Sequence, residues 1–187
     1  MSRIILASQS PRRKQLLEWA EIDFEVVVSN TDESFPASMA IAEVPIHIAR
    51  AKAAAVRALA GNTERIIIAA DTVVVLGDRI IGKPADRSDA IAILQSLSGK
   101  QHEVITGVVI CKGDTEIAFA DRTLVWFHAL TDAQIEFYVD NYKPYDKAGA
   151  YAIQEWIGVV GIRSVEGDFY NVMGLPVSRV VQALAEI

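Results

Sequence analysis

The sequence predicts an α/β fold with a mixed twisted sheet and flanking helices, and three observations support that prediction. Apolar stretches of strand length alternate with amphipathic stretches of helix length early in the chain. Further strand-like stretches then follow one another closely before the last helix. With 51% hydrophobic residues among 187, the chain can bury one well-packed core or two small ones. We therefore expect one domain over residues 1–187.

The chain begins with an apolar stretch, residues 4–6, which we interpret as a short buried strand. A helix should follow it, because Ser10 is a favourable N-cap and Pro11 suits the first helical position. Three cations crowd the first turn of that helix: Arg12, Arg13 and Lys14. The helix dipole disfavours each of them by roughly 0.3–1 kcal/mol, whereas a bound anion would reverse the sign. We therefore predict a polyphosphate cradle here, the alternative being a solvated basic turn.

A second strand and a second helix come next. Residues 24–28 are apolar and β-branched, which is typical of a strand, and they run into a polar loop that carries Glu33. An Ala-rich helix is expected from about 45 to 60, with Lys52 on its surface and a stop at residues 61–62.

The apolar run over residues 66–75 predicts a central strand that is covered on both faces. We expect a break at Asp71 and Thr72, the polar residues within that run. An ionisable side chain in such a run is costly unless it has a partner or a chemical task. Asp71 is therefore a candidate catalytic residue, with a satisfied structural carboxylate as the alternative.

The rest of the chain predicts alternating elements with recognisable ends. A capping-box pattern at residues 131–134 marks one helix start. We expect an interruption of one strand at residues 106–107, and either a strand pair or one long bent strand over 115–127. The expected helices cover 86–97, 131–142 and the residues after Pro176, and the expected strands cover 102–111, 115–127 and 159–165.

Charge and cysteine content exclude several classes of protein. A net charge of −6 argues against a general nucleic-acid binder, which needs a basic face. The single cysteine, Cys111, allows neither a disulfide framework nor a cysteine zinc site, which fits a reducing cytoplasm. No signal peptide precedes the first strand and no apolar run has membrane-spanning length. We expect a cytoplasmic protein that binds a small anion and neither nucleic acid nor membrane.

The polar residues within and between these elements form an inventory for phosphoanhydride hydrolysis. Cations can hold phosphate oxygens, while carboxylates can hold a hard divalent ion or accept a proton from water. The sequence has no P-loop, dinucleotide-binding fingerprint or nucleophile elbow, and its three histidines are scattered. The candidate phosphate-binding residues are Ser10, Arg12, Arg13, Lys52 and Lys83, and the candidate metal ligands are Glu33 and Asp71.

Short blocks along nearly the whole chain resemble, in their order, the Maf family of nucleotide pyrophosphatases. These blocks are Ser10-Pro11-Arg12-Arg13, Asp32-Glu33, Ala49-Arg50-Ala51-Lys52-Ala53, Ala70-Asp71-Thr72, Gly82-Lys83-Pro84, Leu97-Ser98-Gly99, Thr106-Gly107, Asp146-Lys147-Ala148-Gly149-Ala150-Tyr151 and Asn171-Val172-Met173-Gly174-Leu175-Pro176. The resemblance implies an inosine-triphosphatase-like (Maf/Ham1-like) fold with two lobes around a central cleft. It also implies hydrolysis of a nucleoside triphosphate to the monophosphate and pyrophosphate, with Mg²⁺ or Mn²⁺ as cofactor.

Within the family, Asp71-Thr72 and the block over residues 146–154 are similar to the branch that acts on dTTP and UTP. That likeness implies Asp71 as the general base, and Arg12, Thr72 and Gln154 as residues that determine substrate specificity. Glu155 departs from the glycine that often follows the glutamine of this block.

Several alternatives remain open at the level of sequence. The same cradle would suit a nucleotide-binding regulator of cell division or septum formation with little turnover. The substrate is dTTP, UTP or a modified pyrimidine nucleotide, and the protein is a monomer or a homodimer. His102 either orders the site or is a hydrogen-bonded structural histidine.

Overall fold

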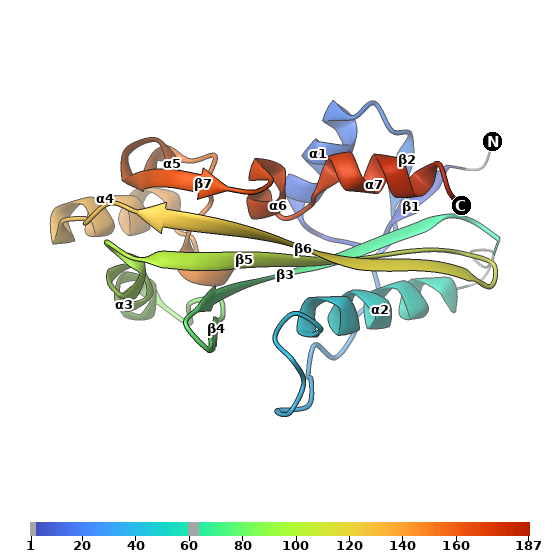
Figure 1. Ribbon diagram of the computed structural model, residues 1–187, viewed down its shortest axis with the longest axis horizontal. Helices are drawn as coiled ribbons and strands as arrows, with labels where there is room; N and C mark the ends of the chain where they lie inside the picture. The colour runs from blue at the N-terminus through green and yellow to red at the C-terminus, as the bar shows by residue number, and fades with distance from the viewer. Residues whose placement is uncertain (1–2, 60–63) are drawn as a thin grey trace. The chain divides into compact units, whose positions relative to one another are not determined.

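The computed structural model describes residues 3–59 and 64–187 and has a mixed α/β architecture (Figure 1). Its seven-stranded sheet has the order β2-β1-β3-β5-β6-β7, and β4 pairs with β3. The strands are β1 (Ile4–Leu6), β2 (Phe24–Val26), β3 (Ile67–Leu76), β4 (Arg79–Ile81), β5 (Gln101–Lys112), β6 (Thr115–Phe127) and β7 (Ile162–Glu166). The helices are α1 (Pro11–Trp19), α2 (Val44–Arg57), α3 (Arg87–Leu97), α4 (Asp132–Tyr142), the 3₁₀ helix η1 (Ala148–Ala150), α5 (Trp156–Gly161), α6 (Phe169–Met173) and α7 (Val177–Leu184).

The sheet combines parallel and antiparallel pairs, as predicted. β1 runs parallel to both β2 and β3, and Ile5 pairs with Ile67. β3 and β4 form an antiparallel hairpin whose turn contains Gly77, at φ +64°. β6 and β7 are also antiparallel. Among the described residues, none of the helices is both long enough and apolar enough to cross a bilayer.

The chain forms two compact units. The first unit contains Met1–Thr72, Thr106–Asp121 and Gly174–Ile187. Its core joins β1, β3 and β5 to α2 through small and β-branched side chains. These are Ile5, Ala7, Ala49, Ala53, Val56, Ile67, Ala69, Val109 and Cys111. In the first unit, α2 and α1 lie on opposite sides of the strands (Figure 1).

The second unit contains Val73–Ile105 and Arg122–Met173. In it, α3 packs against α4 and η1. Its fully buried large side chains include Leu94, Leu97, Phe127, Ile135 and Tyr138. The mixed sheet, the flanking helices and the presence of two units confirm the predicted fold class, while the central cleft stays a prediction.

Local capping confirms three predicted helix starts. The Ser10 side chain accepts a hydrogen bond from Arg13 N at the start of α1. Asp86 caps α3 in the same way, and Thr131 forms the complete capping box with Gln134 at the start of α4. The helix predicted over 45–60 ends at Arg57, and its predicted stop at 61–62 lies outside the described residues.

The predicted strand breaks at Asp71-Thr72 and at residues 106–107 are wrong, because β3 and β5 run through them without interruption. Residues 115–127 likewise form one strand. A strand is held by backbone hydrogen bonds, so a polar side chain does not break it when that side chain has partners. Packing explains the glycine at position 107, because a Cβ there would lie 2.3 Å from Ile46 N.

The strand predicted over 159–165 is wrong in its first three residues, which end α5. The carbonyl of Glu155 accepts from Gly158 N at 2.9 Å and closes the first turn of that helix. A Cβ on Gly158 would meet Ile153 O at 1.6 Å, so only glycine fits this approach. The short helix α6 was not predicted; before it, the Asp168 carboxylate accepts a hydrogen bond from Tyr170 N at 2.7 Å.

Candidate active site

A buried guanidinium, that of Arg13, joins three segments of the first unit. Its Nε donates to Gly174 O at 2.7 Å, Nη1 donates to Ser8 Oγ at 3.2 Å, and Nη2 donates to Thr72 Oγ1 at 2.9 Å. Arg13 is 8% exposed. These bonds tie α1 to the end of β1, to the middle of β3 and to the segment that precedes α7.

The electrostatic surroundings of Arg13 include both predicted metal ligands. Burial lowers the pKa of Arg13, and the charge of Arg12 lowers it further, whereas the charges of Asp71 and Glu33 raise it. Because arginine does not lose its proton in proteins, the two carboxylates face a fixed positive charge.

The hydroxyl of Thr72 has a defined set of neighbours. Its Oγ1 lies 2.9 Å from Arg13 Nη2, 2.9 Å from Thr106 Oγ1 and 3.5 Å from Gly174 O. A hydroxyl has one proton and two acceptor positions, and the arginine can only donate. The contact with Arg13 therefore uses one acceptor position of Thr72, which leaves its other acceptor position and its proton for Thr106, Gly174 or a ligand.

The ammonium group of Lys52 lies against two carboxylates. Its Nζ is 2.8 Å from Asp71 Oδ1 and 2.8 Å from Glu33 Oε1. The side chains of Lys52 and Asp71 are 17% and 14% exposed, and that of Glu33 is 52% exposed. The structure thus brings together three residues that the sequence singled out, from α2, from β3 and from the loop between β2 and α2.

Asp71 and Thr72 are neighbours on β3, and successive side chains of a strand point to opposite faces. Asp71 contacts Lys52 of α2, and Thr72 contacts Arg13 of α1. The strand pairing adds a second feature: β1 pairs with Ile67 and Ile68, whereas β4 pairs with 74–76. Asp71 and Thr72 therefore fall in the interval of β3 between those two pairings.

The carboxylate pair fits a divalent metal of the hard kind. Mg²⁺ takes oxygen ligands and is commonly held by one or two carboxylates together with substrate phosphates. Glu33 and Asp71 converge on one positive charge, that of Lys52 Nζ, so both can address one cation. Over residues 3–59 and 64–187, no group of three or more histidine, cysteine, aspartate or glutamate side chains forms a metal cage. Phosphate and water oxygens would complete the coordination.

The other predicted site residues occupy different positions. Ser10 is half-buried and uses its side chain to cap α1, and Arg12 is half-buried on the same helix. Lys83 is exposed, two residues after the end of β4, and Gln154 is exposed in the turn before α5. Lys83 and Gln154 belong to the second unit, and their roles stay predictions.

Sequence reasoning missed the partners of Arg13 and Thr72. Ser8, Thr106 and Gly174 complete that hydrogen-bonded network. Thr106 carried a signal comparable to that of Asp71, because it is a polar residue inside the largely apolar run over residues 104–111. Gly174 has φ +118°, a conformation that favours glycine.

His102 lies in a buried aromatic cluster of the second unit. Its Nε2 is 2.6 Å from Tyr151 Oη, and its ring makes edge contacts with Tyr151 and Phe127. Burial lowers the pKa of His102 to about 4 and raises the pKa of Tyr151 well above its usual value. Both side chains are therefore neutral at pH 7, which supports the structural interpretation of His102.

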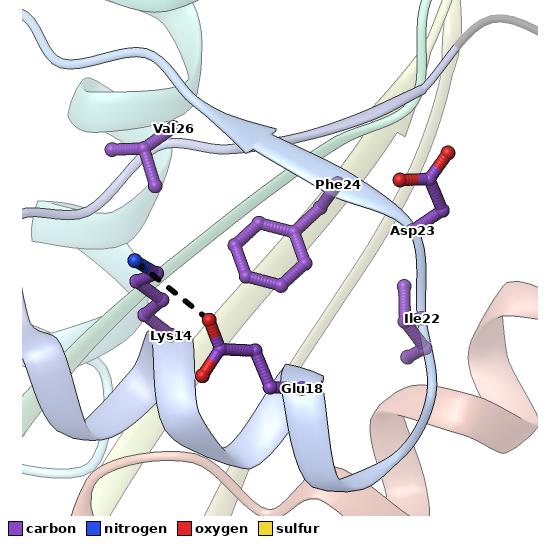
Figure 2. A pocket seen from close by; sticks show the side chains of 6 residues that line it. All are labelled: Lys14, Glu18, Ile22, Asp23, Phe24 and Val26. Carbon is purple, nitrogen blue, oxygen red and sulfur yellow. Dashed lines mark ion pairs between the residues drawn. The ribbon is translucent and has the colours of Figure 1, made fainter.

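A pocket of about 370 Å³ lies between α1 and β2 in the first unit (Figure 2). Its lining residues are Lys14, Glu18, Ile22, Asp23, Phe24 and Val26. Lys14 and Glu18 form an ion pair across one helical turn, at 3.7 Å. Lys14 belongs to the predicted cradle, but the other predicted site residues do not line this pocket, which is therefore separate from the networks of Arg13 and Lys52.

Comparison with known proteins adds independent information. The chain matches the family described as Maf-like protein over residues 3–187. It is 49% identical to a dTTP/UTP pyrophosphatase of Cytophaga hutchinsonii, over 98% of this chain and 84% of the relative. It is 50% identical to a dTTP/UTP pyrophosphatase of Parabacteroides distasonis, over 97% of this chain and 94% of the relative.

A solved structure, that of a HAM1 protein from Coxiella burnetii, shares the fold. It aligns over 100% of both chains with a TM-score of 0.52 and 14% sequence identity. The fold is therefore shared with a protein of low sequence identity, and the sequence match over residues 3–187 is to the Maf-like family. By that match and by its identity to these relatives, the chain belongs to the Maf family.

Proposed function

We propose that the protein is a nucleoside triphosphate pyrophosphatase that hydrolyses dTTP and UTP to the monophosphate and pyrophosphate. Relatives that are 45–50% identical over nearly the whole chain bear the name dTTP/UTP pyrophosphatase. The observation that carries the proposal is the position of Lys52, whose ammonium lies 2.8 Å from both Asp71 and Glu33. Such an enzyme would remove unwanted nucleotides from the cytoplasmic pool.

In the proposed mechanism, Arg12, Arg13, Lys52 and Lys83 neutralise the triphosphate. Glu33 and Asp71 would hold Mg²⁺ or Mn²⁺, which supplies further positive charge to the phosphate oxygens when it is bound. Within the described part of the chain, three of the five N–H groups of Arg13 bond to protein oxygens, and the other two could address a phosphate.

Asp71 acts as the general base. Lys52 donates to its Oδ1, so proton acceptance falls to Oδ2. A water molecule transfers a proton to that oxygen while its own oxygen attacks the α-phosphorus. The bond between the α-phosphorus and the bridging oxygen breaks, and pyrophosphate leaves with the electron pair of that bond. A carboxylate in this position contributes roughly 10²–10⁴-fold to the rate of such reactions.

Base selection falls to Arg12, Thr72 and Gln154. Thymine and uracil share a 4-keto group and an N3 proton, whereas cytosine reverses that donor and acceptor pattern. The contact with Arg13 limits how the Thr72 hydroxyl can bond. When a base with the wrong pattern binds, the Thr72 hydroxyl is left without a hydrogen-bond partner. This loss discriminates strongly against that base.

The test is a panel of canonical and modified triphosphates, assayed with and without Mg²⁺ or Mn²⁺ for pyrophosphate and for orthophosphate. We expect metal-dependent release of pyrophosphate from dTTP and UTP, and slower reaction with dCTP, ATP and GTP. Release of orthophosphate with a nucleoside diphosphate would place the attack at another phosphorus and refute the mechanism. Tight nucleotide binding without turnover would instead favour the regulator of cell division, although a pure binder gains little from carboxylates beside phosphate.

A further inference from the structure

Glu155, which follows the predicted base reader Gln154, belongs to a hydrogen-bonded network of the second unit. Tyr138, a fully buried residue of α4, donates from its hydroxyl to Glu155 Oε2. The same hydroxyl accepts from Ala152 N at 3.1 Å. One phenol therefore binds both ends of the turn 152–155, and Gln154 lies within that turn.

Backbone hydrogen bonding closes the same turn. Glu155 N donates to Ala152 O at 3.1 Å, and Glu155 then serves as the N-cap residue of α5. Gln154 is exposed, while Ala152 and Ile153 before it are buried. The turn therefore projects the Gln154 side chain from a fixed backbone.

A buried cation supports the Glu155 carboxylate from the other side. Lys147 Nζ lies 2.7 Å from Asp146 Oδ1 and 3.8 Å from Glu155 Oε1, and the Lys147 side chain is 11% exposed. A buried charge requires nearby opposite charge. Asp146, whose side chain is 59% exposed, supplies negative charge at the shorter distance, and Glu155, whose side chain is 24% exposed, adds negative charge at the longer one.

We propose that Glu155 is a positioning residue, which Tyr138 and Lys147 clamp so that Gln154 presents its amide to the base in one orientation. The proposal rests on the proposed function, in which Gln154 reads a 4-keto pyrimidine. An amide distinguishes donors from acceptors only when its orientation is fixed, because rotation exchanges its oxygen and its nitrogen. The clamp thus acts on base selectivity through Gln154 and does not contact the reacting phosphate.

The test compares Tyr138→Phe, Glu155→Ala and Glu155→Gln with the parent protein. Tyr142→Phe is the matched control. It also removes a phenolic hydroxyl from α4, one turn after Tyr138, and the ring of Tyr142 stacks on that of Tyr138. For each protein, kcat and KM are measured with dTTP and dCTP. Hydrogen exchange is measured in the peptide that covers residues 151–157.

We expect Tyr138→Phe and Glu155→Ala to raise KM for dTTP and to lower the dTTP-over-dCTP ratio of kcat/KM by roughly tenfold, since one polar contact of the reader is lost. The kcat for dTTP should stay within about twofold, because the clamp is remote from the transferred phosphate. Exchange over 151–157 should become faster in both variants. Glu155→Gln still accepts from Tyr138 and should restore most of the selectivity, and Tyr142→Phe should match the parent.

An unchanged dTTP-over-dCTP ratio in folded Tyr138→Phe and Glu155→Ala would overturn the clamp. If Tyr138→Phe does not fold, Glu155→Ala provides the test, because Glu155 is partly exposed and its replacement is better tolerated. If the parent protein itself does not prefer dTTP to dCTP, the proposed function fails, and hydrogen exchange alone then decides whether the clamp holds the turn. Faster exchange in Glu155→Ala would support the clamp, and unchanged exchange would refute it.

Discussion

A network of the first unit and a cluster of the second unit use polar side chains in opposite ways. In the first unit, charged groups lie against one another: Lys52 contacts Asp71 and Glu33, and Arg13 is buried beside them. In the second unit, the buried cluster of His102 and Tyr151 consists of groups that burial holds in their neutral forms. Hydrolysis of a phosphoanhydride needs cations, a metal ligand and a base, so the first unit carries the residue types for the chemistry.

In the second unit, polar side chains also fix the position of a backbone turn. Its polar groups, including Tyr138 and Glu155, hold the backbone turn that carries Gln154. We expect that base selection through Gln154 can be altered separately from catalysis at Asp71, because Gln154 lies in the turn held by Tyr138 whereas Asp71 bonds to Lys52.

Replacing Asp71 with asparagine should produce the largest loss. Asp71→Asn keeps the shape of the side chain but removes the base and its charge, so turnover should fall by at least roughly 10²–10⁴-fold. Affinity for a non-hydrolysable α,β-linked dTTP analogue should persist or increase, since a repulsive charge beside the phosphates is lost. Steady-state kinetics and calorimetric titration measure the two effects. Asp78→Asn, in the exposed turn after β3, is the control. Parent-like turnover in folded Asp71→Asn would contradict the assignment.

Removing the buried guanidinium should reduce the stability of the protein. Arg13→Ala deletes three hydrogen bonds and leaves Gly174 O, Ser8 Oγ and Thr72 Oγ1 without their cationic donor. We expect the free energy of unfolding to fall by about 3–4 kcal/mol, as measured by urea denaturation. Nucleotide affinity should fall as well, through lost positive charge. Arg12→Ala, at the preceding and less buried position, should weaken nucleotide binding with little change in stability. Equal stability losses in both variants would contradict this account.

Acid should destabilise the fold through His102. The pKa of His102 in the folded protein is about 4, below the usual 6.5. As the pH falls between these two values, the unfolded chain therefore binds a proton that the folded chain does not bind. The contribution of neutral His102 to the free energy of unfolding is complete above pH 6.5. It is lost by pH 4, which lowers the free energy of unfolding by about 3 kcal/mol. Urea denaturation at pH 7 and pH 4.5 checks this expectation. His102→Gln should show a smaller difference between the two pH values, and exposed His128→Gln should behave like the parent. A parent protein that is equally stable at both pH values would argue against a buried neutral histidine.

The smallest of these effects concerns the hydroxyl of Thr72, the proposed base reader. Thr72→Val keeps the volume of the side chain and removes the oxygen that accepts from Arg13. The dTTP-over-dCTP ratio of kcat/KM should fall by roughly tenfold, with a smaller change in kcat for dTTP. Thr123→Val is a useful comparison, because Thr123 is a buried threonine of β6 whose hydroxyl donates to Asp168 O. Unchanged selectivity in Thr72→Val would show that Thr72 does not read the base.

Much of the fold was predictable because its signals are local. Ser10, Asp86 and Thr131 cap helices within three residues of themselves, and the apolar runs marked β3 and β5. The errors arose where distant residues decide. Asp71 and Thr72 do not break β3, because Lys52, Arg13 and Thr106 satisfy them from other elements.

The sequence by itself determined which residue types were available and in which elements, including Asp71 on a buried strand and Lys52 on a helix. Only the tertiary structure decided their partners. Arg13 bonds to Gly174, 161 residues along the chain, and Lys52 bonds to Asp71, 19 residues away. Periodicity and capping depend on neighbours a few residues apart, and so they can be read from the sequence. Pairing of charges depends on how helices pack on a sheet, which is fixed by burial of the whole core.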